Sequence, residues 1–413
     1  MEIEMRFRKI AGFIITTFIC IIIIFANGQA KISALTDSIS IKFTTASPAV
    51  EIPFENYMNY IFLNVKINGV NRCFLLDSGF RYSELNADRI EELGLIAGKS
   101  HQEKTGRGDI VVSSVNDINI ELPGLVITNK TMEAIPLNAL ESGAGRQVYG
   151  VLGFDIISRI TIEIDYDQEM LSLIQPDSFN YAGSGEIVPV ELINNRAYIW
   201  GEVLMPGQYS ILARFGVDTG SDCAIYFESS FIHGKELVTP DQSRIQVGAV
   251  TVGGTTKINV TRLKGFKIGQ TTFDNMIVGY SADTLRGDPV GLIGSEILKR
   301  FKVIFDIAGK RLILEKGQHF NDPFDIDMSG IVPIVDSTDN KSIIISSVSK
   351  NSPAYHEGLK AGDRIFIINQ EPVSEINISK FREMMKKDGA RYILSIKRGE
   401  EIFVAVIKLK RII

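Results

Sequence analysis

Hydrophobic and polar residues alternate in short runs along most of the chain between residues 50 and 318. These runs are rich in β-branched and aromatic side chains, and Asn-Gly, Arg-Gly and Pro-Gly pairs interrupt them. A period of two with turn residues between the runs is typical of β-strands. Short helical patterns follow Gly153 and Gly294. The pattern therefore predicts a mostly β fold, whose clearest early strands are residues 60–67, 72–76, 110–115 and 118–122.

The strand pattern occurs twice, at a constant offset of 141 positions. Asp77-Ser78-Gly79 and Asp218-Thr219-Gly220 each end an apolar run, and a second apolar-apolar-glycine signal ends 76 positions later at Gly153 and Gly294. Other pairs at the same offset are Leu122 and Leu263, Gly124 and Gly265, Ile156 and Ile297, Arg159 and Arg300, and Asp165 and Asp306. This repetition predicts two pseudo-symmetric lobes, residues 50–185 and residues 186–318, with one such carboxylate in each.

Each carboxylate is expected on a tight turn directly after a buried strand. A glycine two residues later lets the backbone turn sharply and approach its neighbour. If a pseudo-twofold axis relates the lobes, Asp77 and Asp218 meet, and two adjacent like charges raise one pKa so that the pair shares a proton. Such a pair activates a water molecule. The alternative is that both tripeptides are ordinary turns, where Asp, Ser and Gly are common.

These motifs resemble those of the retropepsin and pepsin-like aspartic peptidases in their single-chain, two-lobe form. Leu75-Leu76-Asp77-Ser78-Gly79 with Val151-Leu152-Gly153 fits the first lobe, and Gly216-Val217-Asp218-Thr219-Gly220 with Leu292-Ile293-Gly294 fits the second. The resemblance implies an aspartic-type endopeptidase that needs no metal or cofactor. Asp77 and Asp218 would be catalytic, and the other residues would support the loops: Ser78, Gly79, Thr219, Gly220, Gly153 and Gly294. Phe80 departs from the family pattern, which Ser221 keeps.

The last quarter of the chain has a different pattern. An Asp-rich boundary at residues 321–327 precedes expected strands at 343–348, 392–398 and 401–409 and an expected helix at 379–387. Ser352-Pro353-Ala354, the stretch 358–363 and Ile368-Asn369 with Pro372-Val373 resemble a PDZ domain, which we expect over residues 326–413 as a small α+β, barrel-like unit with helices.

A PDZ resemblance implies a peptide ligand that adds as a strand between residues 330–335 and the expected helix. Ser329-Gly330-Ile331-Val332 stands where many members carry a Gly-Leu-Gly-Phe carboxylate loop. The alternative is that the module only packs against the lobes. The residues expected to line the groove are Gly330, Ile331, Val332, Phe381 and Met385.

The N-terminus has the features of an export signal. Three basic residues precede the apolar stretch 10–26, and small residues follow it, so residues 1–30 are either a cleaved signal peptide or an anchor that attaches the chain to a membrane. Export to the periplasm, the cell envelope or the exterior is expected either way. Residues 31–50 are a propeptide or a linker. Export also permits a disulfide between Cys73 and Cys223, although buried thiols fit these residues as well.

A net charge of −5 and a pI near 5.6 argue against a nucleic-acid partner. Taken together, the sequence predicts an exported aspartic endopeptidase that acts on polypeptides and recruits or presents them through its PDZ domain. The alternative from another class is a non-catalytic peptide-binding envelope protein that retains the protease fold. A third is a repeat β scaffold of the envelope.

Overall fold

A computed structural model describes residues 39–105, 108–144, 146–207, 209–239, 241–252, 254–281, 290–335, 342–376, 378–411 and 413. The expected signal or anchor at residues 1–30 lies outside the described residues. In the part of the chain that the structure does describe, no helix combines the length and the apolar character needed to cross a bilayer. The described chain forms two compact units, the first containing residues 39–243 and 249–324, and the second residues 325–413 with 244–248.

A nine-stranded sheet forms the first lobe, in the order β1-β9-β6-β10-β5-β4-β8-β7 with β3 beside β4. Its hairpins follow the turn residues: Asn68 and Gly69 both have positive φ between β4 and β5, and Gly124 after Pro123 joins β8 to β9. The strands are β1 (Ile39–Phe43), β3 (Glu55–Tyr57), β4 (Tyr60–Ile67), β5 (Val70–Leu76), β6 (Glu84–Asn86), β7 (Ser100–Thr105), β8 (Gly108–Leu122), β9 (Leu125–Ile135) and β10 (Gly150–Leu152).

An eight-stranded sheet forms the second lobe, in the order β14-β15-β16-β21-β17-β20-β19-β18. Here β16 lies parallel to β21, as β5 lies parallel to β10 in the first lobe. The strands are β14 (Glu191–Leu192), β15 (Ala197–Leu204), β16 (Ser210–Val217), β17 (Ile225–Phe227), β18 (Arg244–Thr251), β19 (Gly254–Ile268), β20 (Thr271–Ser281) and β21 (Gly291–Ile293).

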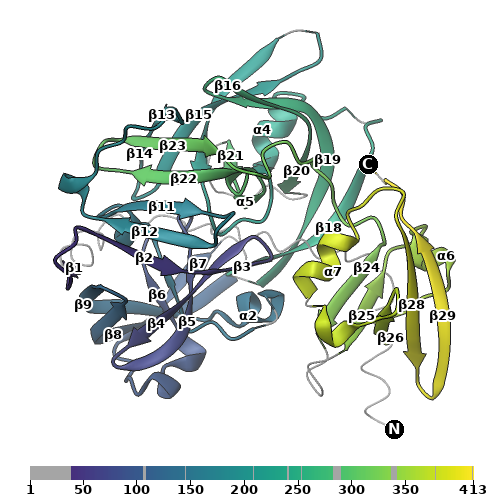
Figure 1. The fold of residues 1–413 in the computed structure, drawn as a ribbon, viewed down its shortest axis with the longest axis horizontal. Helices are drawn as coiled ribbons and strands as arrows, with labels where there is room; N and C mark the ends of the chain where they lie inside the picture. Colours follow the sequence, from purple (N-terminus) through teal and green to yellow (C-terminus); the bar gives the residue numbers. More distant parts are fainter. Residues whose placement is uncertain are drawn as a thin grey trace. The chain divides into compact units, whose positions relative to one another are not determined.

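A third, six-stranded sheet joins the two lobes, with the order β13-β23-β22-β11-β12-β2 (Figure 1). At its centre, β11 of the first lobe pairs antiparallel with β22 of the second, so that Ile164 lies opposite Val303, and both are buried. Burial of this apolar face fixes the lobes against each other. The strands are β2 (Ala49–Pro53), β11 (Thr161–Asp165), β12 (Met170–Ile174), β13 (Glu186–Pro189), β22 (Phe301–Asp306) and β23 (Arg311–Lys316).

Short helices connect these strands. Those of the two-lobed unit are η1 (Ala87–Arg89), η2 (Glu91–Leu93), α2 (Asn138–Ala144), α3 (Phe154–Ile157), η3 (Pro176–Ser178), α4 (Ser229–Gly234) and α5 (Ser295–Leu298). Gly153 and Gly294 hold the N-cap positions of α3 and α5 in matching extended conformations. The two helices thus begin at equivalent points of the repeat.

The C-terminal unit is a six-stranded sheet in the order β24-β25-β26-β28-β29, with β27 beside β26. Its core contains residues of every long strand and of helix α7, which packs beside β24. Pro333 lacks an N–H and lies in β24, as suits a strand at the end of a sheet. The elements are β24 (Ile331–Val335), β25 (Ile343–Val348), α6 (Pro353–His356), β26 (Arg364–Ile368), β27 (Glu371–Pro372), η4 (Val373–Glu375), α7 (Ile378–Met384), β28 (Arg391–Arg398) and β29 (Glu401–Lys408). The prediction of a mostly β fold is therefore confirmed.

Candidate functional site

The two Asp turns lie at equivalent ends of two buried strands. Asp77 follows β5, and its backbone N–H donates to the carbonyl of Leu152 at 3.0 Å; Asp218 follows β16, and its N–H donates to the carbonyl of Ile293 at 2.9 Å. The strands β10 and β21, which end just before Gly153 and Gly294, thus hold the two turns in place. The apolar-apolar-glycine signals in the sequence mark these two supporting strands.

Ser78 and Thr219 join the two turns across the lobes. The backbone N–H of Ser78 donates to Thr219 Oγ1 at 2.9 Å, and the backbone N–H of Thr219 donates to Ser78 Oγ at 3.0 Å. Each hydroxyl then donates to a carbonyl of the opposite lobe: Ser78 Oγ to Val217 at 2.8 Å and Thr219 Oγ1 to Leu76 at 3.2 Å. All four hydrogen bonds are buried, so they hold the two turns rigidly against each other.

Glycines at positions 79 and 220 allow the two turns to approach this closely. A Cβ built on Gly79 would overlap the carboxyl group of Asp218, and a Cβ built on Gly220 would overlap the carboxyl group of Asp77. Each glycine N–H instead donates to the carboxylate of its own turn, at 2.7 Å from Gly79 to Asp77 Oδ1 and at 2.9 Å from Gly220 to Asp218 Oδ1. The repeat therefore brings both carboxyl groups to one place at the junction of the lobes.

Burial dominates the electrostatics of this pair. The side chains of Asp77 and Asp218 are 0% and 2% exposed. Burial raises the pKa of Asp77 to about 6, although the N–H groups of Gly79 and Phe80 oppose this shift. Burial, together with the charge of Asp77, raises the pKa of Asp218 well above its ordinary value. Asp77 Oδ2 is buried and has no hydrogen-bond donor among the described residues, so a proton held by Asp218 would supply one.

The outer support of the pair differs between the lobes. In the first lobe, Ser83 Oγ accepts from the N–H of Gly153 at 2.9 Å and donates to the buried carboxylate of Asp155 at 2.7 Å. In the second lobe, Ser295 Oγ donates directly to the carbonyl of Thr219 at 2.8 Å. The two halves thus orient similar turns through different side chains, in keeping with the offset of 141 positions, which pairs Ser83 with Ala224 and Phe154 with Ser295.

Sequence reasoning missed Arg196, which lies in the hairpin turn directly before strand β15. Its side chain is buried, and its positive charge lowers the pKa of both Asp77 and Asp218, against the effect of burial. The neighbouring Asn195 donates from Nδ2 to the carbonyl of Arg81 in the first lobe. Asn59, in the first hairpin of the other lobe, donates to Glu296 Oε2 at 3.1 Å. In each lobe the hairpin turn therefore contacts the other lobe, and only the second turn brings a cation.

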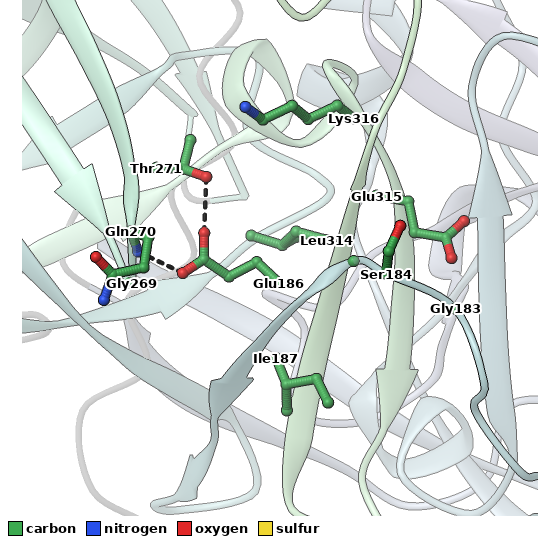
Figure 2. Close-up of a pocket in the computed structure, with 11 residues that line it drawn as sticks. Gly183, Ser184, Glu186, Ile187, Gly269, Gln270, Thr271, Leu314, Glu315 and Lys316 are labelled. Carbon is green, nitrogen blue, oxygen red and sulfur yellow. Dashed lines mark hydrogen bonds between the residues drawn. The ribbon is translucent and has the colours of Figure 1, made fainter.

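A separate hollow of about 950 Å³ lies between strands β13 and β23 and the turn that joins β19 to β20 (Figure 2). Glu186 on β13 accepts hydrogen bonds there from the N–H of Gln270 and from Thr271 Oγ1, the second at 2.7 Å. This carboxylate links the central sheet to the second lobe. The predicted site residues lie elsewhere.

Two further expectations concern metals and cysteines. Among the described residues, no group of three or more His, Cys, Asp or Glu side chains is placed to hold a metal ion. Cys73 and Cys223 are both thiols and do not form a disulfide. Burial raises the pKa of the Cys73 thiol, so this group stays protonated at neutral pH.

The residues predicted to line the C-terminal groove lie in two settings. Gly330 has φ of 74° and precedes β24, where Ile331 and Val332 begin the strand at the end of the sheet. Phe381 on α7 and Met385 directly after it are fully buried in the core of this unit. The structure thus brings strand and helix together, while the side chains of Ile331, Phe381 and Met385 all belong to the core of this unit.

Residues 329–396 match the sequence profile of the family described as PDZ domain. This part of the chain is a PDZ domain. The predicted PDZ resemblance is therefore confirmed, together with the fold class that it implies for the C-terminal unit.

Two curated proteins share shorter stretches with the chain. One is the periplasmic serine endoprotease DegP of Salmonella typhimurium, 41% identical over 61 residues, which are 15% of this chain and 12% of that protein. The other is a probable periplasmic serine endoprotease, DegP-like, of Buchnera aphidicola, 34% identical over 67 residues, or 16% of this chain and 14% of that protein. The chain thus spans about an eighth of the length of these relatives.

The names of these relatives correct the expected enzyme class. Both proteins are described as serine endoproteases, which contradicts the assignment of this chain as an aspartic-type endopeptidase of the retropepsin or pepsin-like kind. Short Asp-Ser/Thr-Gly motifs carried that assignment, and such motifs do not by themselves define a peptidase class. The coarser statement that the comparisons support is that the chain contains a PDZ domain and shares a short stretch with periplasmic endoproteases.

Proposed function

We propose that the chain is an exported protein that hydrolyses polypeptides at the carboxyl pair Asp77 and Asp218, with its PDZ domain recruiting or presenting the polypeptide. The proposal concerns the chemistry of these two carboxyl groups and rests on their geometry. The observation that carries it is the reciprocal contact of Ser78 and Thr219, because those bonds fix two buried carboxyl groups beside each other.

The pair has the properties that water activation requires. A general base must be ionised and its partner protonated, and two adjacent carboxyl groups that differ in pKa meet both needs. Burial raises the pKa of both groups, but the hydrogen bond between them lowers the pKa of Asp77 and raises that of Asp218, so the shared proton belongs to Asp218 and Asp77 is the base. Asp77 would take a proton from water as the oxygen attacks the substrate carbonyl carbon, and Asp218 would protonate the carbonyl oxygen. Proton transfer to the amide nitrogen then breaks the C–N bond and leaves an acid and an amine.

The PDZ domain supports a polypeptide as the substrate. Strand β24 lies at the end of the described sheet beside α7, and PDZ domains bind extended peptides by adding a strand at such an edge. The apolar stretch at residues 10–26 and the periplasmic relatives support export. A peptide-binding protein without hydrolysis would use the same edge and would leave the carboxyl pair without a role.

The test is hydrolysis of an unfolded polypeptide in the presence of two reagents. A peptide with a statine-type hydroxyl group mimics the tetrahedral state between two carboxyl groups and should inhibit, whereas a fluorophosphonate that labels activated serines should not. We also expect kcat/KM to fall as the pH drops below about 6, because Asp77 then gains a proton and the base is lost. Inhibition by the fluorophosphonate alone, or an absence of hydrolysis at every pH between 3 and 8, would contradict the proposal.

A further inference from the structure

The loop that precedes β24 in the PDZ domain already holds a carboxylate of its own chain. Asp327 Oδ1 accepts hydrogen bonds from the N–H of Ser329 at 2.8 Å, from the N–H of Gly330 at 2.9 Å and from Ser329 Oγ at 2.7 Å. The N–H of Ile331 donates to Ser329 Oγ at 3.0 Å. The backbone donors of three consecutive residues are therefore engaged within the loop.

This loop lies where the end of a bound peptide would be. Strand β24 runs from Ile331 to Val335 and has β25 on one side, while α7 packs beside it. A peptide that pairs antiparallel with β24 has its C-terminal end next to Ile331, because antiparallel strands run in opposite directions. A free terminal carboxylate at this point would need N–H donors from residues 329–331.

The negative charge of Asp327 also disfavours the terminal carboxylate of a peptide at this loop. Its Oδ2 atom is buried and has no hydrogen-bond partner among the described residues. Burial raises the pKa of Asp327 to about 6, against the opposing effects of the loop hydrogen bonds and of Arg382 on α7, so the group is mostly ionised at pH 7. A second carboxylate beside it would meet like charge as well as occupied donors.

We propose that the PDZ groove selects extended segments from within a polypeptide and rejects free C-terminal carboxylates, because Asp327 and Ser329 occupy the donors of the loop and Asp327 places a negative charge beside them. This inference rests on the proposed binding of peptides at β24. An internal segment continues past Ile331 as neutral backbone and places no charge beside Asp327. The groove would therefore bind a polypeptide chain anywhere along its length, as recruitment of an unfolded substrate requires.

The experiment uses the full chain with the Asp218→Asn substitution, so that the probe is not cut. The probe is a pool of random decapeptides made in equal amounts as free acids and as C-terminal amides, and mass spectrometry measures the ratio of the two forms retained on the immobilised protein. The same measurement is made with Asp327→Asn added, since an Asn side chain has nearly the same shape and can still accept from the loop. Ser329→Ala, which frees the N–H of Ile331, is the second variant.

We expect the Asp218→Asn protein, which keeps Asp327, to retain peptide amides over peptide acids by at least about tenfold, which corresponds to about 1.4 kcal/mol. Asp327→Asn should lower that ratio at least fivefold, and Ser329→Ala should lower it in the same direction. Peptides that bind between the lobes contribute equally to all three proteins, so the change in ratio reports on the PDZ groove. An unchanged ratio, or retention of free acids over amides, would overturn the inference and leave peptide binding intact. If no peptide is retained, peptide binding at β24 itself fails, and the inference fails with it.

Discussion

At the scale of single residues, the absence of a side chain matters as much as the carboxyl groups do. Gly220 lies so close to Asp77 that a Cβ would overlap the carboxyl group, with Oδ2 the nearest atom. The glycine of the Asp-Thr-Gly turn is therefore required by the neighbouring lobe. The same holds for Gly79 and Asp218.

A prediction follows for Gly220→Ala. The added methyl group would displace the carboxyl group of Asp77 and separate the pair, so hydrolysis should fall by roughly 10³-fold, as expected for loss of a positioned acid–base group. Gly234→Ala is the matched control, because no atom lies within 4 Å of a Cβ at that position and its activity should stay unchanged. The measurement is kcat/KM on the same unfolded polypeptide. Normal activity of Gly220→Ala would mean that the pair is not the reacting centre.

Single residues also show which parts of the site can be predicted from the sequence and which cannot. The offset of 141 positions identified Asp77, Asp218 and their hydroxyl neighbours, because each is part of a local turn motif. Arg196 was missed, since a single arginine after Asn194-Asn195 carries no local pattern that places it near the two carboxyl groups. The hydrogen bonds that Asp327 accepts from its own loop were missed for a related reason: the order of the residues does not show which way a side chain points.

At the scale of elements, the local pattern predicted strands well and pairings poorly. The expected strand at residues 343–348 coincides with β25, and the expected helix at 379–387 overlaps α7 but ends later than the structure has it. Alternation and turn residues are local, so they fix such bounds to within a few residues. The central sheet was not predicted, because β11 and β22 are far apart in the chain and alternation does not specify a partner.

The Ser78 and Thr219 turns yield a prediction about stability. Thr219→Val keeps the shape of the side chain and removes its hydroxyl, which leaves the N–H of Ser78 buried without its acceptor. We expect the free energy of unfolding to fall by roughly 2–3 kcal/mol, measured by urea denaturation. Thr219→Ser retains the hydroxyl and should lose less than about 1 kcal/mol. Equal stability of the Val variant and the native protein would show that the reciprocal bonds do not hold the turns.

At the scale of the whole molecule, two units have different tasks in this account. The two-lobed unit carries one carboxyl group on each of two equivalent turns, and neither lobe alone contains a pair. The PDZ domain carries an edge strand whose entrance loop is occupied by Asp327. Each task depends on a different set of residues, so each can be removed without changing the residues of the other.

The central claim is that Asp77 and Asp218 act as one unit, and comparing single and double variants tests it most directly. We predict that Asp77→Asn and Asp218→Asn each lower kcat/KM by at least roughly 10³-fold, and that the double variant is no worse than either, because groups that act together are lost together. Asp117→Asn, at an exposed position within β8 where the backbone φ is 58°, should leave the rate unchanged. Full activity of either single variant, or losses that multiply in the double variant, would contradict the claim.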